Sequence, residues 1–355
     1  MGRQTMKGTA MPKPVTALLL SAAALVALAG SACGGSDKKA TATKGDHATD
    51  ASARHLPSGR FAFRRFLDVG QSQGAVFTVN TDGTGERQIT QPPPLTVDDQ
   101  PDWSPDGKQI AFERCSDSSG CSAMVVPADG GQPRPVSVKC RLSGGCDVSA
   151  PAWTPDGRLV VELAQGSEKA HGDARQIERQ SLELVNLSTG AQRTIVKLDH
   201  WKGGQSGPAV SADGRTVVYT RENSWLTKPG LAVALFSVGI HGSHNRRITP
   251  FTFGDGMHPA FSPDGVVLYG DEESESDYWT VKPNGTERTQ LTHFKHGELV
   301  LSGSYSPDGD WIVHAGKGAN GAADLYVMKA DGTGNRPFKR TKAWDSAPDW
   351  GPGPP

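Results

Sequence analysis

The chain lacks three features that would point to particular classes of protein: an excess of charge, a long amphipathic helix and an apolar stretch of membrane-spanning length. Lys and Arg number 37 against 38 Asp and Glu, so the formal net charge is −1. Proteins that bind the nucleic-acid backbone usually carry a basic patch and a high pI, so this balance argues against a nucleic-acid partner. Because no helical period is found beyond the N-terminus, we expect an all-β domain.

The longest apolar run, Val15–Ala29, is shorter than the ~20 residues that a bilayer-spanning helix needs. Arg3, Lys7 and Lys13 precede it, which is the pattern of an export signal. The segment that follows resembles the signal of bacterial lipoproteins, in which small residues precede a cysteine that is lipidated and becomes the N-terminus. It departs from that pattern at Gly30, where the family has Leu, Val or Ile.

The resemblance implies a signal peptide over residues 1–32 and lipidation of Cys33, with palmitate among the expected acyl groups. It also implies a protein held on the extracytoplasmic face of the cell membrane by its lipid alone. Cleavage after Ala29 is the alternative and would leave a secreted protein. Residues 33–58 are mostly Ala, Thr, Lys, Asp, Gly and Ser, which cannot bury enough surface to fold, so we expect a flexible tether there.

Residues 59–355 are organised by a repeat. Its best copy, Gln100–Phe112, has an apolar run, a Pro-Asp-Gly turn and a second run that alternates apolar and polar residues, which predicts two antiparallel strands. The turn glycines recur at intervals of 42 to 57 residues. The copies centre on Gly107, Gly157, Gly214, Gly265 and Gly309, with a shortened sixth copy at Pro348–Gly351. Each copy is followed by an apolar strand, a polar turn and a short strand, and such a period predicts a propeller.

The repeat is out of phase at its ends. The domain opens at Phe61 without a preceding Pro-Asp-Gly copy, whereas the copy at Trp350 has no later strands. We therefore expect a six-bladed β-propeller of four-stranded antiparallel blades, whose C-terminal segment pairs into the first blade and closes the ring. The aromatic residues of the repeat, such as Trp103, should pack between blades. The aspartates of the turns, such as Asp106, should cap those turns.

The pattern Pro-x-Trp-Ser-Pro-Asp-Gly, followed by Tyr-Val-Met-x-x-Asp-Gly, resembles the PD40 repeat of TolB-type propellers. The resemblance covers about residues 56–355 and implies a six-bladed propeller that is exported and acts in protein–protein contact. TolB itself carries an α/β domain ahead of its propeller, and only the polar tether occupies that place here. A role in the Tol–Pal system therefore does not carry over, whereas the propeller and its tendency to bind other molecules do.

Beyond Cys33 there are four cysteines, in two pairs whose partners are six positions apart: Cys115 with Cys121, and Cys140 with Cys146. An even number in an exported domain suggests disulfides, and local pairing is the simplest arrangement. The alternative is a four-cysteine zinc site, but the spacing is longer than that of such sites. We expect no bound metal and no cofactor.

Two motifs resemble functional sites. Gly70–Gly74 matches the nucleophile elbow of hydrolases but lies between two expected strands, so a hairpin loop is favoured. The acidic run Asp271–Asp277 contains carboxylates that could bind calcium, yet it lacks the glycine and the fixed alternation of calcium loops, so a solvated hairpin is favoured.

The channel mouth is the best candidate for binding, because the innermost strands begin there. The residues that the repeat places at this mouth are Asp99, Gln100, Ser149, Ser206, His258 and Ser346. His258 is the only histidine at its repeat position, where a structural role is favoured over a catalytic one. The leading hypothesis is a monomeric, non-catalytic module that binds a protein, a peptide or an envelope glycan. The alternative is a lyase or hydrolase with a metal in the channel. It would need several histidines and carboxylates at the axis, and only His258 and Asp99 are candidates, so no residue is assigned a catalytic role.

Overall fold

The computed structural model describes residues 56–142, 145–167, 176–199, 205–223, 232–253, 258–271, 277–294, 300–317 and 321–353. Every regular element in these ranges is a β-strand, as expected from the sequence. No helix long and apolar enough to cross a membrane is found among them. The export signal, Cys33 and the tether up to residue 55 lie outside the described residues.

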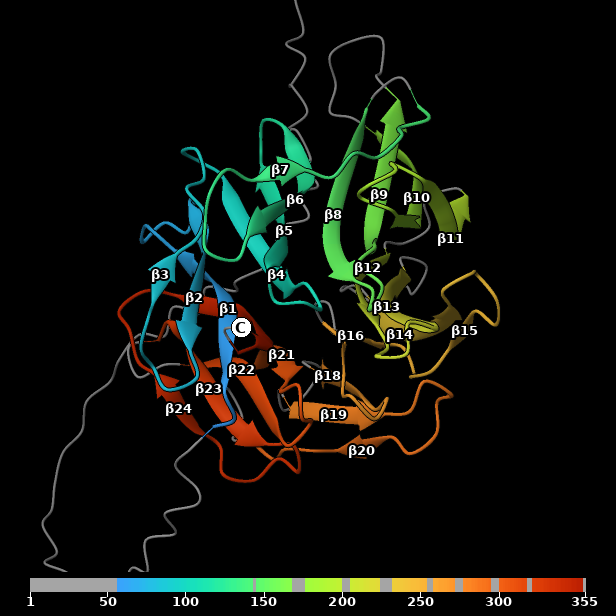
Figure 1. Cartoon of the computed structure of the whole chain (residues 1–355). Helices are drawn as coiled ribbons and strands as arrows, with labels where there is room; N and C mark the ends of the chain where they lie inside the picture. Colours follow the sequence, from blue (N-terminus) through green and yellow to red (C-terminus); the bar gives the residue numbers. More distant parts are fainter. Residues whose placement is uncertain are drawn as a thin grey trace, which may run out of the picture.

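The strands form antiparallel sets that follow one another around a central axis (Figure 1). Set 1 consists of β25 (Asp345–Pro352), β1 (Gly59–Phe66), β2 (Gly74–Asn80) and β3 (Arg87–Gln88). Set 2 consists of β4 (Val97–Trp103), β5 (Gln109–Ser116), β6 (Gly120–Pro127) and β7 (Arg134–Pro135). A single parallel pair, Gly74 with Val97, joins these two sets into one larger sheet.

In sets 4 to 6 the strands run in chain order from the axis outward. Set 3 has the same arrangement, with β8 innermost and β11 outermost. Set 3 consists of β11 (Gln192–Asp199), β10 (Gln176–Val185), β9 (Leu159–Ser167) and β8 (Cys146–Trp153). Set 4 consists of β12 (Gln205–Val210), β13 (Thr216–Asn223), β14 (Ala232–Gly239), β15 (Arg246–Arg247) and β16 (Thr252–Phe253). Set 5 consists of β17 (Ala260–Phe261), β18 (Val267–Asp271), β19 (Asp277–Val281) and β20 (Thr289–Gln290). Set 6 consists of β21 (Val300–Tyr305), β22 (Trp311–Lys317), β23 (Ala323–Lys329) and β24 (Arg336–Lys339).

Set 4 departs from the expected four strands. Both β15 and β16 pair with β14, at Phe236–Ser237 and at Ala232–Val233 respectively. Pro250 lies between the two short strands and has no N–H to donate to a ladder. The fifth strand is therefore the second piece of an outer strand that is interrupted at this proline.

The turns of the repeat are held by their aspartates. The Ser104 hydroxyl donates to Asp106 Oδ1 over 2.7 Å, and the Thr154 hydroxyl donates to Asp156 Oδ1 over 2.5 Å. The Ser104 hydroxyl lowers the pKa of Asp106, whereas the pKa of Asp156 is lowered first by Arg158, which donates to it over 2.9 Å, and then by the Thr154 hydroxyl. Gly107 has a φ of 67°, a conformation that favours glycine. The prediction that these aspartates cap turns is confirmed.

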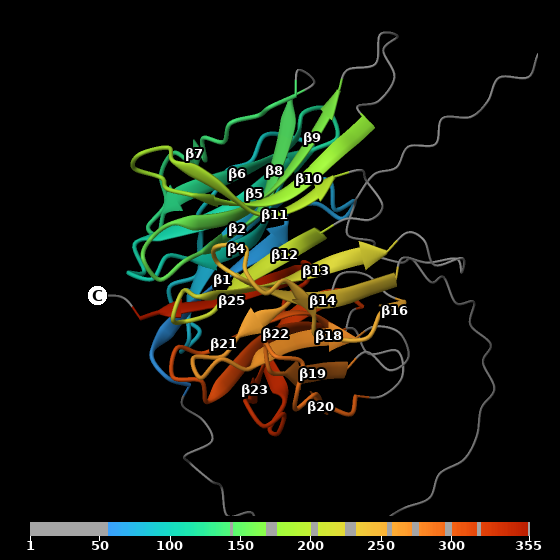
Figure 2. The same cartoon turned by 90° about the vertical axis from the view of Figure 1, so that its right-hand side faces the viewer.

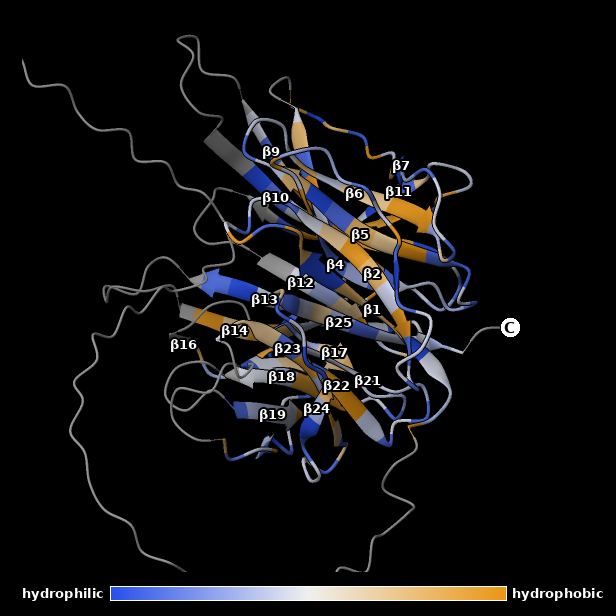
Figure 3. Ribbon diagram, turned by 90° about the vertical axis from the view of Figure 1, so that its left-hand side faces the viewer, coloured by the Kyte–Doolittle hydropathy of each residue, from blue (hydrophilic) through white to orange (hydrophobic). Residues whose placement is uncertain are grey.

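The core consists of apolar clusters that each join two neighbouring sets. Trp103 packs with residues of sets 1 and 2, Trp153 with sets 2 and 3, and Trp350 with sets 6 and 1. Three more clusters join sets 3 and 4, 4 and 5, and 5 and 6. Figure 3 shows the corresponding hydrophobic segments along β2, β5 and β6. The repeat aromatics therefore pack between sheets, as expected, and each set is stabilised only by its neighbours.

The innermost strands carry a repeated bulge. In β4, Asp99 pairs with Glu113 and Asp102 with Ala111, so two inner residues lie opposite one residue of β5. The residue before the proline has a positive φ at Gln100 (49°), Ala150 (45°), His258 (37°) and Ala347 (51°). Residues before proline usually adopt extended conformations, so the sequence does not predict this positive φ. The one exception is Gly207 (φ 54°), which occupies the same repeat position and is a residue that tolerates it.

The four cysteines form the two local bridges favoured by their spacing. Cys115 and Cys121 are cross-strand partners at the end of the β5–β6 hairpin and are joined to each other. Cys140, in the connection between β7 and β8, is joined to Cys146 at the start of β8.

The two ends of the described chain lie side by side. Strand β25 pairs antiparallel with β1, with Phe61 opposite Trp350, and Figure 2 shows the two strands together. Trp350 is only 5% exposed and meets Phe61 edge to face at a centroid distance of 4.7 Å. The Arg65 guanidinium donates to both oxygens of Asp345 over 2.7 Å. Packing and ion pairing thus both stabilise this junction.

Deletion of residues 347–355 should strongly destabilise the domain, because it removes a strand partner of β1 and a buried indole. The substitution Trp350→Ala alone should cost about 3–5 kcal/mol of unfolding free energy. Thermal and denaturant unfolding would measure both effects, with deletion of residues 353–355 as the control. A melting temperature unchanged by the longer deletion would contradict this account of the junction.

Candidate functional site

The clearest polar cluster lies where β1, β4 and β25 meet. Arg64 donates through one terminal nitrogen to Asp99 and through the other to the Ser346 hydroxyl over 2.6 Å. All three side chains are buried. A buried cation and carboxylate are tolerated only when paired and hydrogen-bonded in this way. The ion pair thus links the first two sets to the C-terminal strand.

Glu113 extends the cluster to set 3. It is the cross-strand partner of Asp99, and its Oε2 accepts a hydrogen bond of 2.9 Å from the backbone N–H of Ala150. Ala150 is a bulge residue, so this carboxylate satisfies an amide outside the regular ladder. Burial and the charge of Asp99 raise the pKa of Glu113 to about 7.

Glu162 occupies the equivalent position of set 3. It is the cross-strand partner of Ser149, whose hydroxyl lies 3.4 Å from Glu162 Oε2, and the Gln180 amide donates to Oε1 over 2.6 Å. Burial and the charge of Glu113 raise the pKa of Glu162 to about 8. Two acidic side chains with pKa values near neutrality therefore stand in adjacent sets, each able to hold or release a proton.

The structure brings some of the six predicted residues together. Asp99 and Ser346 meet at Arg64, Ser149 lies beside Glu162, and the backbone N–H of Gln100 donates to Asp99 Oδ1 over 2.7 Å. Ser206 lies on β12 as the partner of Thr220, and its side chain is outside the description. His258 precedes Pro259 and shares the positive φ of Gln100. Sets 4 and 5, which carry these two residues, lie across the axis from β1 (Figure 1).

Sequence reasoning missed Arg64, Glu113 and Glu162. They belong to the second strand of their sets, whereas the predicted site residues all lie on or just before the innermost strands. A signal was present in each case, because a charged residue interrupts an apolar run: Phe61–Phe63 before Arg64, Ile110–Phe112 before Glu113, and Leu159–Val161 before Glu162. Figure 3 shows that β4, their neighbour at the axis, is itself hydrophilic.

The structure gives no support to a nucleophile elbow at residues 70–74 or to a calcium site at residues 271–277. Ser72 lies in the loop between β1 and β2, where its hydroxyl donates to Asp68 Oδ2 over 3.0 Å, so the segment is a hairpin loop as expected. Residues 272–276 of the acidic run lie outside the described residues. Within the described ranges, no three His, Cys, Asp or Glu side chains are grouped so that they could hold a metal ion.

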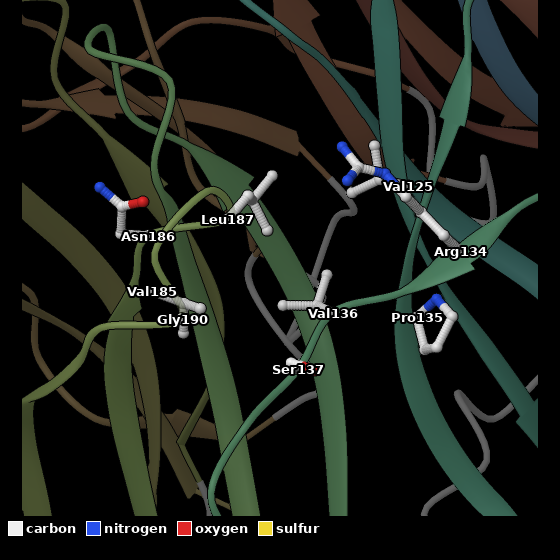
Figure 4. Close-up of a pocket in the computed structure, with 9 residues that line it drawn as sticks. All are labelled: Val125, Arg134, Pro135, Val136, Ser137, Val185, Asn186, Leu187 and Gly190. Carbon is white, nitrogen blue, oxygen red and sulfur yellow. The ribbon is translucent and has the colours of Figure 1, made fainter.

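A shallow cavity of about 180 Å³ lies between sets 2 and 3, away from this cluster (Figure 4). Val125, Arg134 and Val136 line one side, and Val185 and Leu187 line the other. Its volume is below the ~300 Å³ at which ligand pockets for drug-sized molecules begin. The polar cluster around Arg64 is thus the better candidate for function.

No family model matches the chain. It is 25% identical over 169 residues to an uncharacterized peptidase, YuxL, of Bacillus subtilis, covering 47% of this chain and 20% of the peptidase. It is 23% identical over 233 residues to the Tol-Pal system protein TolB of Francisella tularensis subsp. mediasiatica, covering 65% of this chain and 48% of that protein. The chain thus spans between a fifth and a half of the length of these relatives.

A solved structure of TolB from Acinetobacter baumannii superposes with a TM-score of 0.59 and 17% identity, covering 83% of this chain and 67% of TolB. At this identity the similarity shows the fold alone. The chain therefore has an all-β, TolB-like propeller fold, and its function has to be argued from its own residues.

Stability should fall as the pH rises through the folded-state pKa of Glu162. That pKa, about 8, lies above the usual 4.5, so the folded protein holds a proton that the unfolded chain releases. The stability that this proton contributes is complete below about pH 4.5 and is lost as the pH rises through about 8. Glu162→Gln keeps an acceptor for Gln180 but cannot ionise, so its melting temperature should fall less than that of the wild type between about pH 5 and pH 9.

The exposed Glu287→Gln is the matched control and should keep the wild-type slope. Parallel curves for the wild type and Glu162→Gln would show that Glu162 does not titrate as described.

Proposed function

We propose that the chain is an exported, six-bladed β-propeller, residues 59–355, that binds another molecule at the mouth formed around Arg64. The six strand sets would be its blades. Two observations support this count and the closure of the ring. Apolar clusters join each set to the next, including set 6 to set 1. The innermost strands also contact one another in a full circle, in the order β25, β4, β8, β12, β17, β21 and back to β25.

A lipid anchor at Cys33 is the second part of the proposal. The described chain begins at Leu56 and enters β1 at Gly59, which pairs with Pro352 near the turn at Gly107. Arg64 lies toward the other end of the same strand. A tether from the membrane would therefore reach the end of the propeller opposite the mouth. The binding face would then point away from the membrane, toward partners in the cell envelope.

The observation that carries the binding role is the gathering of buried polar groups at one end of the innermost strands. Arg64, Asp99 and Glu113 come from two sets and offer both signs of charge beside strained backbone. Buried polar clusters and strained bulges cost stability, and they concentrate at functional sites in proteins. The expected partner is a protein, a peptide or an envelope glycan, recognised by polar contacts at this mouth.

Site-specific crosslinking would test the position of the binding face. A photoreactive residue at Gln100 samples the mouth, whereas the same residue at Lys108, on the exposed turn of the same hairpin, samples the opposite end. We expect a discrete crosslinked species in cells from position 100 and none from position 108. Equal crosslinking at both positions, or a species formed only at position 108, would contradict the proposed face.

Lipidation has a separate test. Metabolic labelling with a fatty-acid analogue should mark the wild-type protein and should disappear in Cys33→Ala. The variant should also move from the membrane fraction to the soluble exported fraction. Persistent labelling of Cys33→Ala would overturn the anchor without affecting the proposed fold.

A further inference from the structure

The backbone amides at the axis are satisfied in one half of the ring by side chains of the preceding set. The N–H of Trp103 donates to Asp349 Oδ2 over 2.8 Å, and that of Trp153 donates to Asp102 Oδ2 over 2.5 Å. The N–H of Trp350 lies 3.3 Å from the Ser304 hydroxyl oxygen. Asp349, Asp102 and Ser304 all occupy the same repeat position, directly before the aromatic residue. A side chain at this position therefore caps the edge of the next set.

The other half of the ring has alanine at this position: Ala152, Ala209 and Ala260. Their methyl groups cannot accept a hydrogen bond from the next set, whose corresponding N–H groups belong to Val210, Phe261 and Tyr305. Among the described residues, no side chain accepts from these three amides.

The direction of these amides follows from the strand register. The residue after each of them bonds to the second strand: Ser211 to Thr216, Ser262 to Val266 and Ser306 to Trp311. Val210, Phe261 and Tyr305 are therefore in non-hydrogen-bonded pairs, and their N–H groups point away from the second strand, toward the axis. Ala209, Val210, Ala260 and Phe261 are only half-buried, so the space beside them is accessible.

The half of the ring that carries Asp102, Asp349 and Ser304 offers hydrogen-bond acceptors, whereas the alanine half offers N–H donors. Burial and the charge of Asp349 raise the pKa of Asp102 well above its usual range, and burial also raises the pKa of Asp349. Two adjacent buried carboxyl groups share a proton more readily than they ionise together. Around the axis, acceptor oxygens thus face a half-ring of amide donors lined with methyl groups.

We propose that the axis binds the acetamido group of an N-acetylhexosamine. The carbonyl oxygen would accept from the amides of Val210 and Phe261, which belong to neighbouring innermost strands, and the methyl group would pack on Ala209 and Ala260. The amide N–H and the sugar hydroxyls would donate to Asp102 and Asp349. This inference rests on the proposed binding role and names a ligand class for the axis behind the mouth.

A sugar fits better than a peptide because its hydroxyls supply several donors for the acceptor half, whereas a peptide backbone supplies only its N–H groups. The site also offers a small methyl-lined surface, which matches one acetyl group. The backbone amides of the alanine half would be left without an acceptor by a ligand that lacks the acetamido carbonyl, so the site should discriminate strongly against such ligands.

The test is a titration of the whole exported protein with N-acetylglucosamine, followed through the backbone amide resonances. We expect saturable shifts at Val210 and Phe261, and none at these positions with glucosamine or glucose. The triple variant Ala152→Ser, Ala209→Ser and Ala260→Ser supplies at each position the hydroxyl that Ser304 supplies in set 6. It should weaken binding at least tenfold without lowering the melting temperature. Ala191→Ser, in an exposed turn, is the matched control and should bind as the wild type does.

If the triple variant does not fold, the double variant Ala209→Ser and Ala260→Ser, at the two half-buried positions, replaces it. Unchanged affinity in a folded serine variant would overturn the assignment. Shifts produced only by acetyl-glycine-N-methylamide would assign the axis to a peptide and overturn the sugar. Crosslinking from position 100 does not depend on these amides, so failure at the axis and failure at the mouth can be told apart.

Discussion

The pairing of β25 with β1 is the contact on which the rest of the molecule depends. Each strand set buries its apolar faces only against its neighbours, so an incomplete set 1 would expose the clusters on both of its sides. The contact joins residues almost 300 positions apart, Phe61 and Trp350, and it is reinforced by the ion pair of Arg65 with Asp345. The large entropy of closing so long a loop is offset by packing along a whole strand.

The same junction creates the polar cluster. Arg64 follows the buried run of β1, and its partners Asp99 and Ser346 come from β4 and β25. The bulges of the innermost strands then turn backbone amides, such as that of Ala150, toward the carboxylate of a neighbouring set. The architecture and the polar cluster are therefore linked, because the bulges of the inner strands also bring backbone amides and carboxylates of neighbouring sets together near the axis.

The sequence predicted the architecture well because turn residues and aromatic residues recur at matching positions of the repeat. Asp106 and Gly107 indicate a tight turn locally, and the aromatic residue at the position of Trp103 is buried in four of the six copies. The site was harder to predict because its positions differ between copies. Arg64, Glu113, Glu162 and Thr220 are equivalent in the register of their strands, yet only the two glutamates have the same chemistry. The meeting of Asp102 with Asp349 depends on the pairing of β25 with β1; the repeat predicts that pairing but not which side chains then come together.

The central claim is that the C-terminal strand is an integral part of the first strand set. Residue-resolved hydrogen exchange measures this directly, because an integral strand exchanges only when the whole domain unfolds. The account predicts that the amides of Ala62 and Asp349, which are cross-strand partners in β1 and β25, are as strongly protected as those of Ile110 and Val161 in sets 2 and 3. Exchange at Asp349 as fast as in a frayed terminus, with Ile110 still protected, would contradict it.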